Sequence, residues 1–181
     1  RLRTPFLYGV NMLQSYFELL ELVQSGVITG LDSINQVKGS SIDVRLGKTI
    51  QKEYDGHHIV SLAERNMVSA WTIDITKDGY YDLKPGEFIL AHTMEKFNMP
   101  DNLSATFHLK STCARMGIGH LLAVHIDPGF NNSVLTLEMH NVTRYHTIRL
   151  RAGDHIGQIL FWSHKEVPPH ASYRNNGRYN N

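Results

Sequence analysis

Short segments in which apolar and polar residues alternate are the feature that most limits the fold of this chain. Ser41–Leu46 alternates as SIDVRL, Leu103–Lys110 places its apolar residues on one face, and Ser133–His140 repeats the pattern. This period of two is that of a half-buried β-strand. Phe88–Thr93 follows a Lys-Pro-Gly-Glu turn, and glycine, proline and asparagine separate the other segments. The pattern predicts a mainly β sandwich or barrel.

One segment near the N-terminus has the spacing of a helix instead. Three apolar residues of Gln14–Gln24 recur at helical intervals: Phe17, Leu20 and Val23. Ser15 is a candidate cap, and Gly26 is a candidate stop. We therefore expect a single clear helix ahead of the strands.

Composition bounds the class of protein. With 181 residues, of which 41% are hydrophobic, residues 1–181 fit one globular domain. The sequence has no run of about 18 apolar residues that could cross a membrane. Lys and Arg number 18 against 17 acids without a dense basic cluster, so we expect no nucleic-acid polymer as partner. The single cysteine, Cys113, excludes an internal disulfide and suits a reducing compartment such as the cytoplasm. The chain opens on Arg1 and not on methionine, which leaves its natural start open.

A Lys-Ser-Thr turn follows the strand that ends near Leu109. The turn consists of Lys110, Ser111 and Thr112. Arg115 follows four residues after the serine. Small hydroxyl residues beside a glycine and a cation let backbone amides and side chains approach phosphate oxygens. From these residues alone, a solvated turn without a ligand is the alternative.

A lone carboxylate, Glu138, interrupts an otherwise apolar strand. Leu135, Leu137 and Met139 share one face of that strand, so Glu138 lies on the other, mixed face. On an exposed sheet it would be an ordinary surface glutamate. If the mixed face lines a cleft, the side chain is partly desolvated and can transfer protons near neutral pH. Asp127, in the turn IDPGF, offers a second carboxylate in a different setting.

Seven motifs in one order give the chain a family resemblance from about Ser41 to the C-terminus. They are SIDVRLG, LKPGEFILAHT, KSTCARMGIG, IDPGF, TLEMHN, IGQILF and a terminal Tyr-x-x-x-x-Arg-Tyr. Together they resemble the dCTP deaminases of the dUTPase superfamily. The resemblance implies a distorted β-barrel or jelly-roll of the dUTPase-like type, assembled as a homotrimer with active sites at subunit boundaries. Residues 1–12 precede the resemblance as an N-terminal arm, and residues 168–181 are expected to be a lid that orders only with nucleotide.

Glu138 distinguishes the two activities of the superfamily. The dUTPases have a small apolar residue at this position, whereas the deaminases resemble this chain in having glutamate. The resemblance thus implies deamination of dCTP to dUTP and ammonia, continuing to dUMP if the site also cleaves the triphosphate. Zinc deaminases need a signature that ends in Cys-x-x-Cys, which one cysteine cannot supply. A plain dUTPase and a catalytically silent nucleotide-binding trimer remain as alternatives.

The resemblance also assigns residues. It implies a catalytic group of Glu138, Ser111 and Arg115. It implies a set of substrate-binding residues: Lys110, Thr112, Ala123, Asp127, Phe130, Gln158, Tyr173 and Arg178. In this set the Ala123 carbonyl holds the water, Asp127 and Phe130 hold the deoxyribose, and the others grip the triphosphate. Mg²⁺ is expected on the triphosphate, with no direct protein ligand.

Three departures from the family pattern bear on the site. Lysine replaces arginine at Lys110, which leaves a point charge in place of a fork. His125 stands where some members have arginine. Asn131-Asn132 adds one residue between IDPGF and the glutamate, so we expect a bulge, aided by asparagine's tolerance of the left-handed conformation, that keeps Glu138 on its predicted face.

Overall fold

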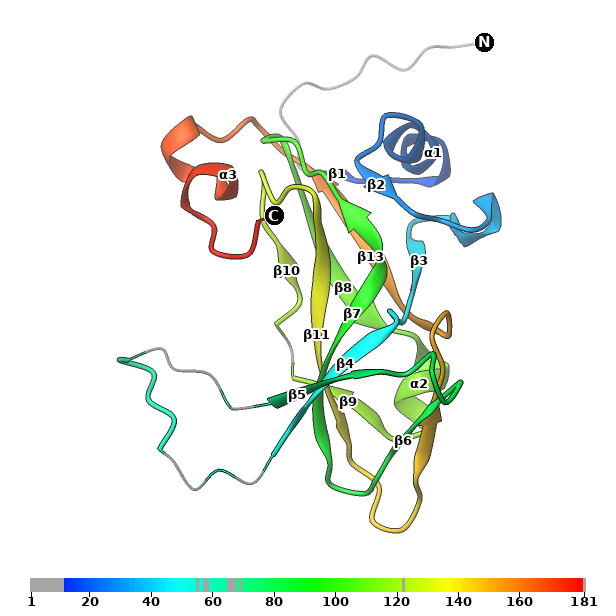
Figure 1. Cartoon of the computed structure of the whole chain (residues 1–181). Coiled ribbons are helices and arrows are strands. Elements are labelled where there is room, and N and C mark those ends of the chain that lie inside the picture. The colour runs from blue at the N-terminus through cyan, green and yellow to red at the C-terminus, as the bar shows by residue number, and fades with distance from the viewer. Residues whose placement is uncertain are drawn as a thin grey trace.

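The structure is a computed structural model, which describes residues 12–180 except 55, 57, 58, 65–67, 69 and 122. The proposed arm at residues 1–12 therefore lies outside the described residues, apart from Met12. Figure 1 shows a body of strands with short helices at its periphery. In the described chain, no helix combines the length and apolarity needed to cross a membrane.

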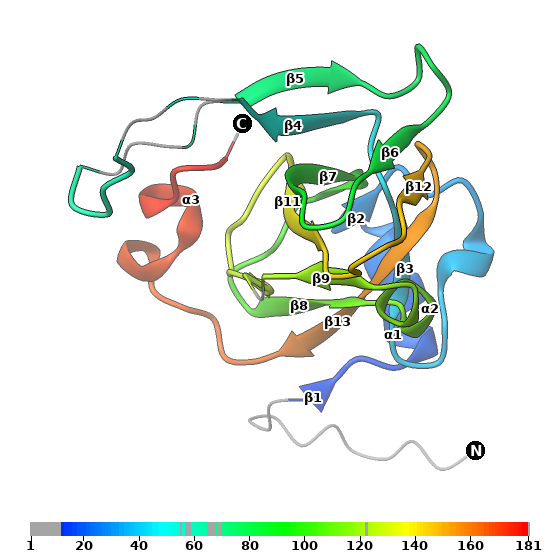
Figure 2. The same ribbon diagram turned by 90° about the horizontal axis from the view of Figure 1, so that it is seen from below.

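Two antiparallel sheets form the body, and Figure 2 shows β7 and β11 of one sheet facing β8 and β13 of the other. In the first sheet, β13 (His155–Ser163) pairs with β1 (Met12–Leu13), β3 (Ile42–Arg45) and β8 (Leu103–Leu109). In the same sheet, β8 also pairs with β10 (His125–Ile126). The second runs β5 (Ala70–Asp74), β4 (Thr49–Glu53), β7 (Phe88–Phe97), β11 (Ser133–Asn141) and β9 (Ile118–His120), with β2 (Ile28–Thr29) on β7. A further pair joins β6 (Tyr81–Leu83) to β12 (Ile148–Leu150).

The core lies between the two sheets, as the alternating strands predicted. Phe97, Phe107 and Phe161 are fully buried there. The odd-numbered residues of β11 point into this core, and all three that were predicted to do so are buried: Leu135, Leu137 and Met139. On β3 the polar residues Asp43 and Arg45 are buried as well, so that strand has no solvent face.

The predicted helix is confirmed as α1 (Tyr16–Gln24). The Ser15 backbone N–H donates to Glu18 Oε2 at 3.0 Å, and Gly26 ends the turn with φ of +78°, a conformation that glycine adopts at little cost. The apolar stripe is shifted from the expected one, because Leu19 is fully buried while Phe17 is 74% exposed.

Besides α1, the described chain has four short helical turns. They are η1 (Ile34–Gln36) before β3, α2 (Ser111–Arg115) after β8, and η2 (Pro169–Ala171) and α3 (Tyr173–Asn176) in the tail. The α2 turn follows directly where the strand Leu103–Lys110 was predicted to end.

The pairing of β11 with β7 has an irregularity, but its extra residues lie on β7, so it is not the bulge expected to absorb the extra residue at Asn131-Asn132. The pairing of β11 with β7 shifts between Val134↔Lys96 and Thr136↔His92, so β7 has two more residues there than β11. Thr93 stabilises the irregularity by accepting from the Leu135 backbone N–H at 3.0 Å. Because the shift is even, side chains keep their faces on both sides of it. Asn132 adopts φ of +49°, as its predicted tolerance allows.

A buried ion pair anchors this bulge to β3. Glu95 is fully buried, and its Oε1 accepts from Arg45 Nε at 2.8 Å and from Gln36 Nε2 at 2.9 Å. The Arg45 backbone N–H donates to Oε2 of the same carboxylate at 2.8 Å. The motif SIDVRLG therefore supplies the partner that lets a glutamate enter the core.

Glu95→Ala is expected to lower the free energy of unfolding by about 3–5 kcal/mol, because it breaks a buried ion pair and leaves Arg45 Nε and Gln36 Nε2 without this acceptor. The Asp32 carboxylate remains, 2.9 Å from Arg45 Nη1. Chemical denaturation at one fixed protein concentration measures the change. Asp82→Ala is the matched control, since it breaks the exposed Asp82–Arg149 pair, with N–O distances of 2.8 Å, and exposed pairs contribute little. Equal losses in the two variants would contradict the anchoring role of Glu95.

Candidate active site

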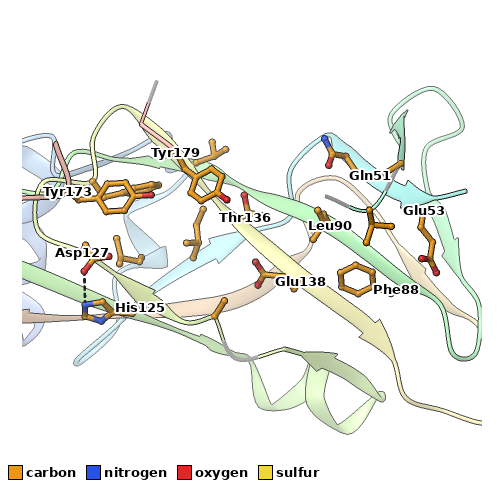
Figure 3. A pocket seen from close by; sticks show the side chains of 17 residues that line it. Gln51, Glu53, Phe88, Leu90, His125, Asp127, Thr136, Glu138, Tyr173 and Tyr179 are labelled. Carbon is orange, nitrogen blue, oxygen red and sulfur yellow. Dashed lines mark ion pairs between the residues drawn. The ribbon is translucent and has the colours of Figure 1, made fainter. Parts of the chain in front are cut away.

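A cavity of about 600 Å³ opens beside β11, and Figure 3 shows the side chains that line it. Its walls come from β4, β5, β7, β10, β11, the turn after β10 and the C-terminal tail. Five residues predicted as site residues line it: Ala123, Asp127, Phe130, Glu138 and Tyr173. The structure thus brings together the predicted proton-transfer glutamate and the predicted sugar-binding residues.

Glu138 faces the middle of this cavity, together with Val134 and Thr136 of the same strand face. The predicted phase of β11 is therefore confirmed. The Glu138 side chain keeps 25% of its surface exposed, but its Oε2 atom is buried without a hydrogen bond among the described residues. His120 Nε2 lies 3.3 Å from that oxygen, although the contact lacks hydrogen-bond geometry.

The IDPGF turn forms one end of the cavity. The Phe130 backbone N–H donates to the Asp127 carbonyl at 3.2 Å, and the Met99 N–H donates to the Phe130 carbonyl at 2.7 Å. These bonds fix a buried Phe130 ring beside a half-exposed Asp127 carboxylate. His125 Nε2 lies 3.3 Å from Asp127 Oδ1, so the residue that replaces the family's arginine contacts the aspartate of the turn.

The tail forms a wall of the cavity, and its expected ordering on nucleotide binding stays a prediction. Residues of α3 and beyond pack on the IDPGF turn of their own subunit: the Tyr173 N–H donates to the Pro128 carbonyl at 2.9 Å, and the Asn131 N–H donates to Asn180 Oδ1 at 2.8 Å. The Tyr173 ring meets Phe130 edge-on at 5.6 Å. The sequence SYRNNGRYNN looked too polar to order itself, but its asparagines bond to backbone groups.

Gly129 permits this close packing. A Cβ atom there would lie 2.2 Å from Ser172 Oγ and 2.8 Å from the Arg174 backbone nitrogen, and its φ of +85° disfavours other residues. Tyr179, the last residue of the terminal motif, lines the cavity although no role was predicted for it, whereas Arg178 does not line it.

The remaining predicted residues lie outside the cavity. Ser111, Thr112 and Arg115 are exposed on α2, which Figures 1 and 2 place on the opposite side of the body from α3. Lys110 Nζ donates to Asp43 Oδ2 at 2.6 Å, and Gln158 pairs with Asp43 in the register of β13 and β3. We name Lys110, Ser111, Thr112 and Gln158 the phosphate wall, after their predicted role.

Cys113 lies on α2 beside the phosphate wall. Burial raises the pKa of the Cys113 thiol, and the Sγ atom lies 3.6 Å from the His155 carbonyl oxygen. Burial therefore disfavours the thiolate, the form in which a cysteine acts as a nucleophile.

Sequence comparison identifies the family. A model of the dCTP deaminase-like family matches residues 14–164. This chain belongs to that family. A protein of Methanospirillum hungatei named dCTP deaminase, dUMP-forming, is 37% identical over 150 residues, which are 81% of this chain and 79% of the relative. One of the same name from Leifsonia xyli is 34% identical over 157 residues, or 83% of this chain and 77% of the relative.

Solved structures confirm the predicted dUTPase-like fold. A 2′-deoxycytidine 5′-triphosphate deaminase from Agrobacterium tumefaciens superposes with a TM-score of 0.66 at 20% identity, over 84% of this chain and 48% of that chain. A dUTPase from Streptococcus mutans superposes with a TM-score of 0.50 at 15% identity, over 78% of this chain and 98% of that chain. The family match begins at Gln14 and not near Ser41, so it includes α1, and it ends before the tail motif.

Proposed function

We propose that this chain hydrolyses the exocyclic amino group of dCTP, without zinc, at a site built around Glu138. The observation that carries the proposal is the position of Glu138: it faces a cavity whose end is formed by Asp127 and Phe130. Membership of the dCTP deaminase-like family supports the same substrate. A dUTPase needs no carboxylate at this place, and the curated relatives named above are deaminases.

The proposed chemistry assigns all proton transfers to Glu138. Its carboxylate takes a proton from a water held by the Ala123 carbonyl, and the water oxygen forms a bond to C4 of cytosine. Glu138 passes that proton to N3 as the ring becomes tetrahedral at C4. Glu138 then takes the proton of the new C4 hydroxyl and gives it to N4, the C4–N4 bond breaks, ammonia leaves, and C4 keeps a carbonyl oxygen. Each dCTP consumes one water and yields one dUTP and one ammonia.

Ser111 and Arg115 are proposed to complete this site from a neighbouring subunit. The serine hydroxyl would donate to the oxygen that develops negative charge at C4, and the guanidinium would orient the glutamate. Within one subunit these side chains lie on exposed α2 and do not line the cavity that holds Glu138. A homotrimer in which α2 of one subunit faces the cavity of the next would unite the two halves.

The triphosphate is proposed to lie on the phosphate wall, with Tyr173 and Arg178 contributed by the tail. Among residues 12–54, 56, 59–64, 68, 70–121 and 123–180, no group of three His, Cys, Asp or Glu side chains could hold a metal ion. The hydroxyls and cations of the wall fit a nucleotide that brings its own Mg²⁺. Mg²⁺ would be held by the triphosphate of the substrate and would neutralise part of its charge.

We further propose that the product is dUMP. Both curated relatives described above are named dUMP-forming. A second water would cleave dUTP between its α- and β-phosphates, so that one dCTP and two waters yield dUMP, pyrophosphate and ammonia. We place this reaction in the cytoplasm, where it would supply deoxyuridine nucleotides for thymidylate synthesis.

Product analysis tests the proposal. The protein is incubated with dCTP or with dUTP in the presence of Mg²⁺, and ammonia, dUTP, dUMP and pyrophosphate are measured. We expect ammonia and dUMP in equal amounts from dCTP. Pyrophosphate from dUTP without ammonia from dCTP would indicate a plain dUTPase, and neither product would indicate a silent nucleotide-binding protein.

A further inference from the structure

His120 is a buried histidine whose ring nitrogens lack hydrogen-bond partners. It is the last residue of β9, and its side chain is 4% exposed. Neither Nδ1 nor Nε2 has a hydrogen-bond partner among the described residues, and the Phe107 ring covers the imidazole at a centroid distance of 4.9 Å. A buried polar group without a partner costs free energy, so such a group calls for an explanation.

The one carboxylate recorded within 4.0 Å of this ring, in the described part of the chain, is that of Glu138. Its Oε2 atom is also buried and unpartnered, and it lies 3.3 Å from His120 Nε2. Two complementary groups thus face each other, and each lacks any other described partner. Phe107, the other recorded neighbour of the ring, cannot titrate.

The backbones that carry the two side chains are fixed relative to each other. His120 pairs with Met139 in the register of β9 and β11, and the Leu121 backbone N–H donates to the Glu138 carbonyl at 3.1 Å. Only a side-chain rotation is needed to align the two groups. Catalytic hydrogen bonds are often poorly aligned in a free enzyme and tighten when the substrate binds.

We propose that His120 is a positioning residue for Glu138. Its imidazole N–H donates to Oε2 from the buried side, which leaves Oε1 as the oxygen that meets water and substrate in the cavity. Glu138 must take a proton and return it within one turnover, and a carboxylate held by one oxygen cannot rotate away between these steps. This inference rests on the proposed deamination.

Two substitutions of His120 test the proposal. His120→Leu removes the donor, and we expect kcat for dCTP deamination to fall roughly 10–100-fold, as for the loss of one hydrogen bond to a charged group. KM should change less than about threefold, because uniform substrate binding is untouched. His120→Gln places an amide N–H near the position of Nε2, and we expect it to recover most of the lost kcat.

The controls separate positioning from packing. His140→Leu changes a half-buried histidine on β11 that does not line the cavity, and we expect kcat and KM close to those of the wild type. Equal losses in the His120→Leu and His140→Leu variants, or a glutamine variant no better than leucine, would overturn the proposal. If the leucine variant does not fold, ¹⁵N spectra decide: the His120 ring signals should differ between wild type and Glu138→Gln, and unchanged signals would refute the contact.

The outcomes also separate this inference from the function on which it rests. A wild-type protein that releases no ammonia from dCTP overturns both. A wild-type protein that releases ammonia, with a His120→Leu variant of equal kcat, overturns the positioning role alone.

Discussion

Glu138→Gln is expected to lower ammonia release from dCTP by roughly 10²–10⁴-fold, the range for loss of a general acid–base group. Glutamine has nearly the shape of glutamate but can neither take the proton of the attacking water nor return it to the leaving amine. Because Glu138 is assigned every proton transfer, we expect the upper part of this range. Steady-state ammonia assays at saturating dCTP measure the change.

The matched control for this variant is Glu53→Gln. Glu53 lines the same cavity from β4 and is exposed, but no proton transfer is assigned to it, so we expect a small effect. dCTP binding by Glu138→Gln, measured by calorimetry, should stay near the wild-type value, since the side chain acts on the base and not on the triphosphate. A Glu138→Gln protein that still deaminates at a wild-type rate would exclude Glu138 as the proton carrier.

Mixing two inactive variants is expected to restore activity. Ser111→Ala should lose roughly 10²–10³-fold in kcat, as for an oxyanion donor, and Glu138→Gln should be nearly inactive as well. If each site takes Glu138 from one subunit and Ser111 from the next, random trimers formed from equal amounts carry both intact residues in about a quarter of their sites. The ammonia assay on refolded mixtures should therefore rise to about a quarter of the wild-type rate.

The control for mixing is each variant refolded alone, which must remain inactive. Every subunit in the mixture carries one lesion, so a site made within a single subunit cannot be restored. If mixtures shown to contain mixed trimers do not recover ammonia release, the result would contradict a site shared between subunits. It would also contradict the proposed role of Ser111 in the reaction.

Much of the fold was predictable because buried strands leave a period of two in the sequence. The phase of Ser133–His140 correctly predicted which side chains of β11 enter the core, and from that phase the direction of Glu138 followed. A bulge was expected to absorb the extra residue at Asn131-Asn132, whereas the irregularity that the structure has adds residues to β7. On β7 the polar residues Thr93 and Glu95 break the apolar pattern, and only the pairing of Glu95 with Arg45 shows why a strand continues through them.

The cavity was predictable only in part, since its walls come from segments far apart in the chain. Asp127, Phe130 and Glu138 belong to motifs, whereas Phe88 and Leu90 line the cavity because β7 pairs with β11. No sequence pattern marks His120, which ends a three-residue strand. The contacts of the tail could not be predicted, because they include bonds between asparagine side chains and backbone groups, which composition does not reveal.

Ammonia release by the wild-type protein tests the central claim most directly. The protein is given dCTP and Mg²⁺, and ammonia is counted against the dCTP consumed. We expect one ammonia for each dCTP, with dUMP as the pyrimidine product. Consumption of dCTP that yields pyrophosphate and dCMP without ammonia, or no consumption at all, would contradict a deaminase built around Glu138.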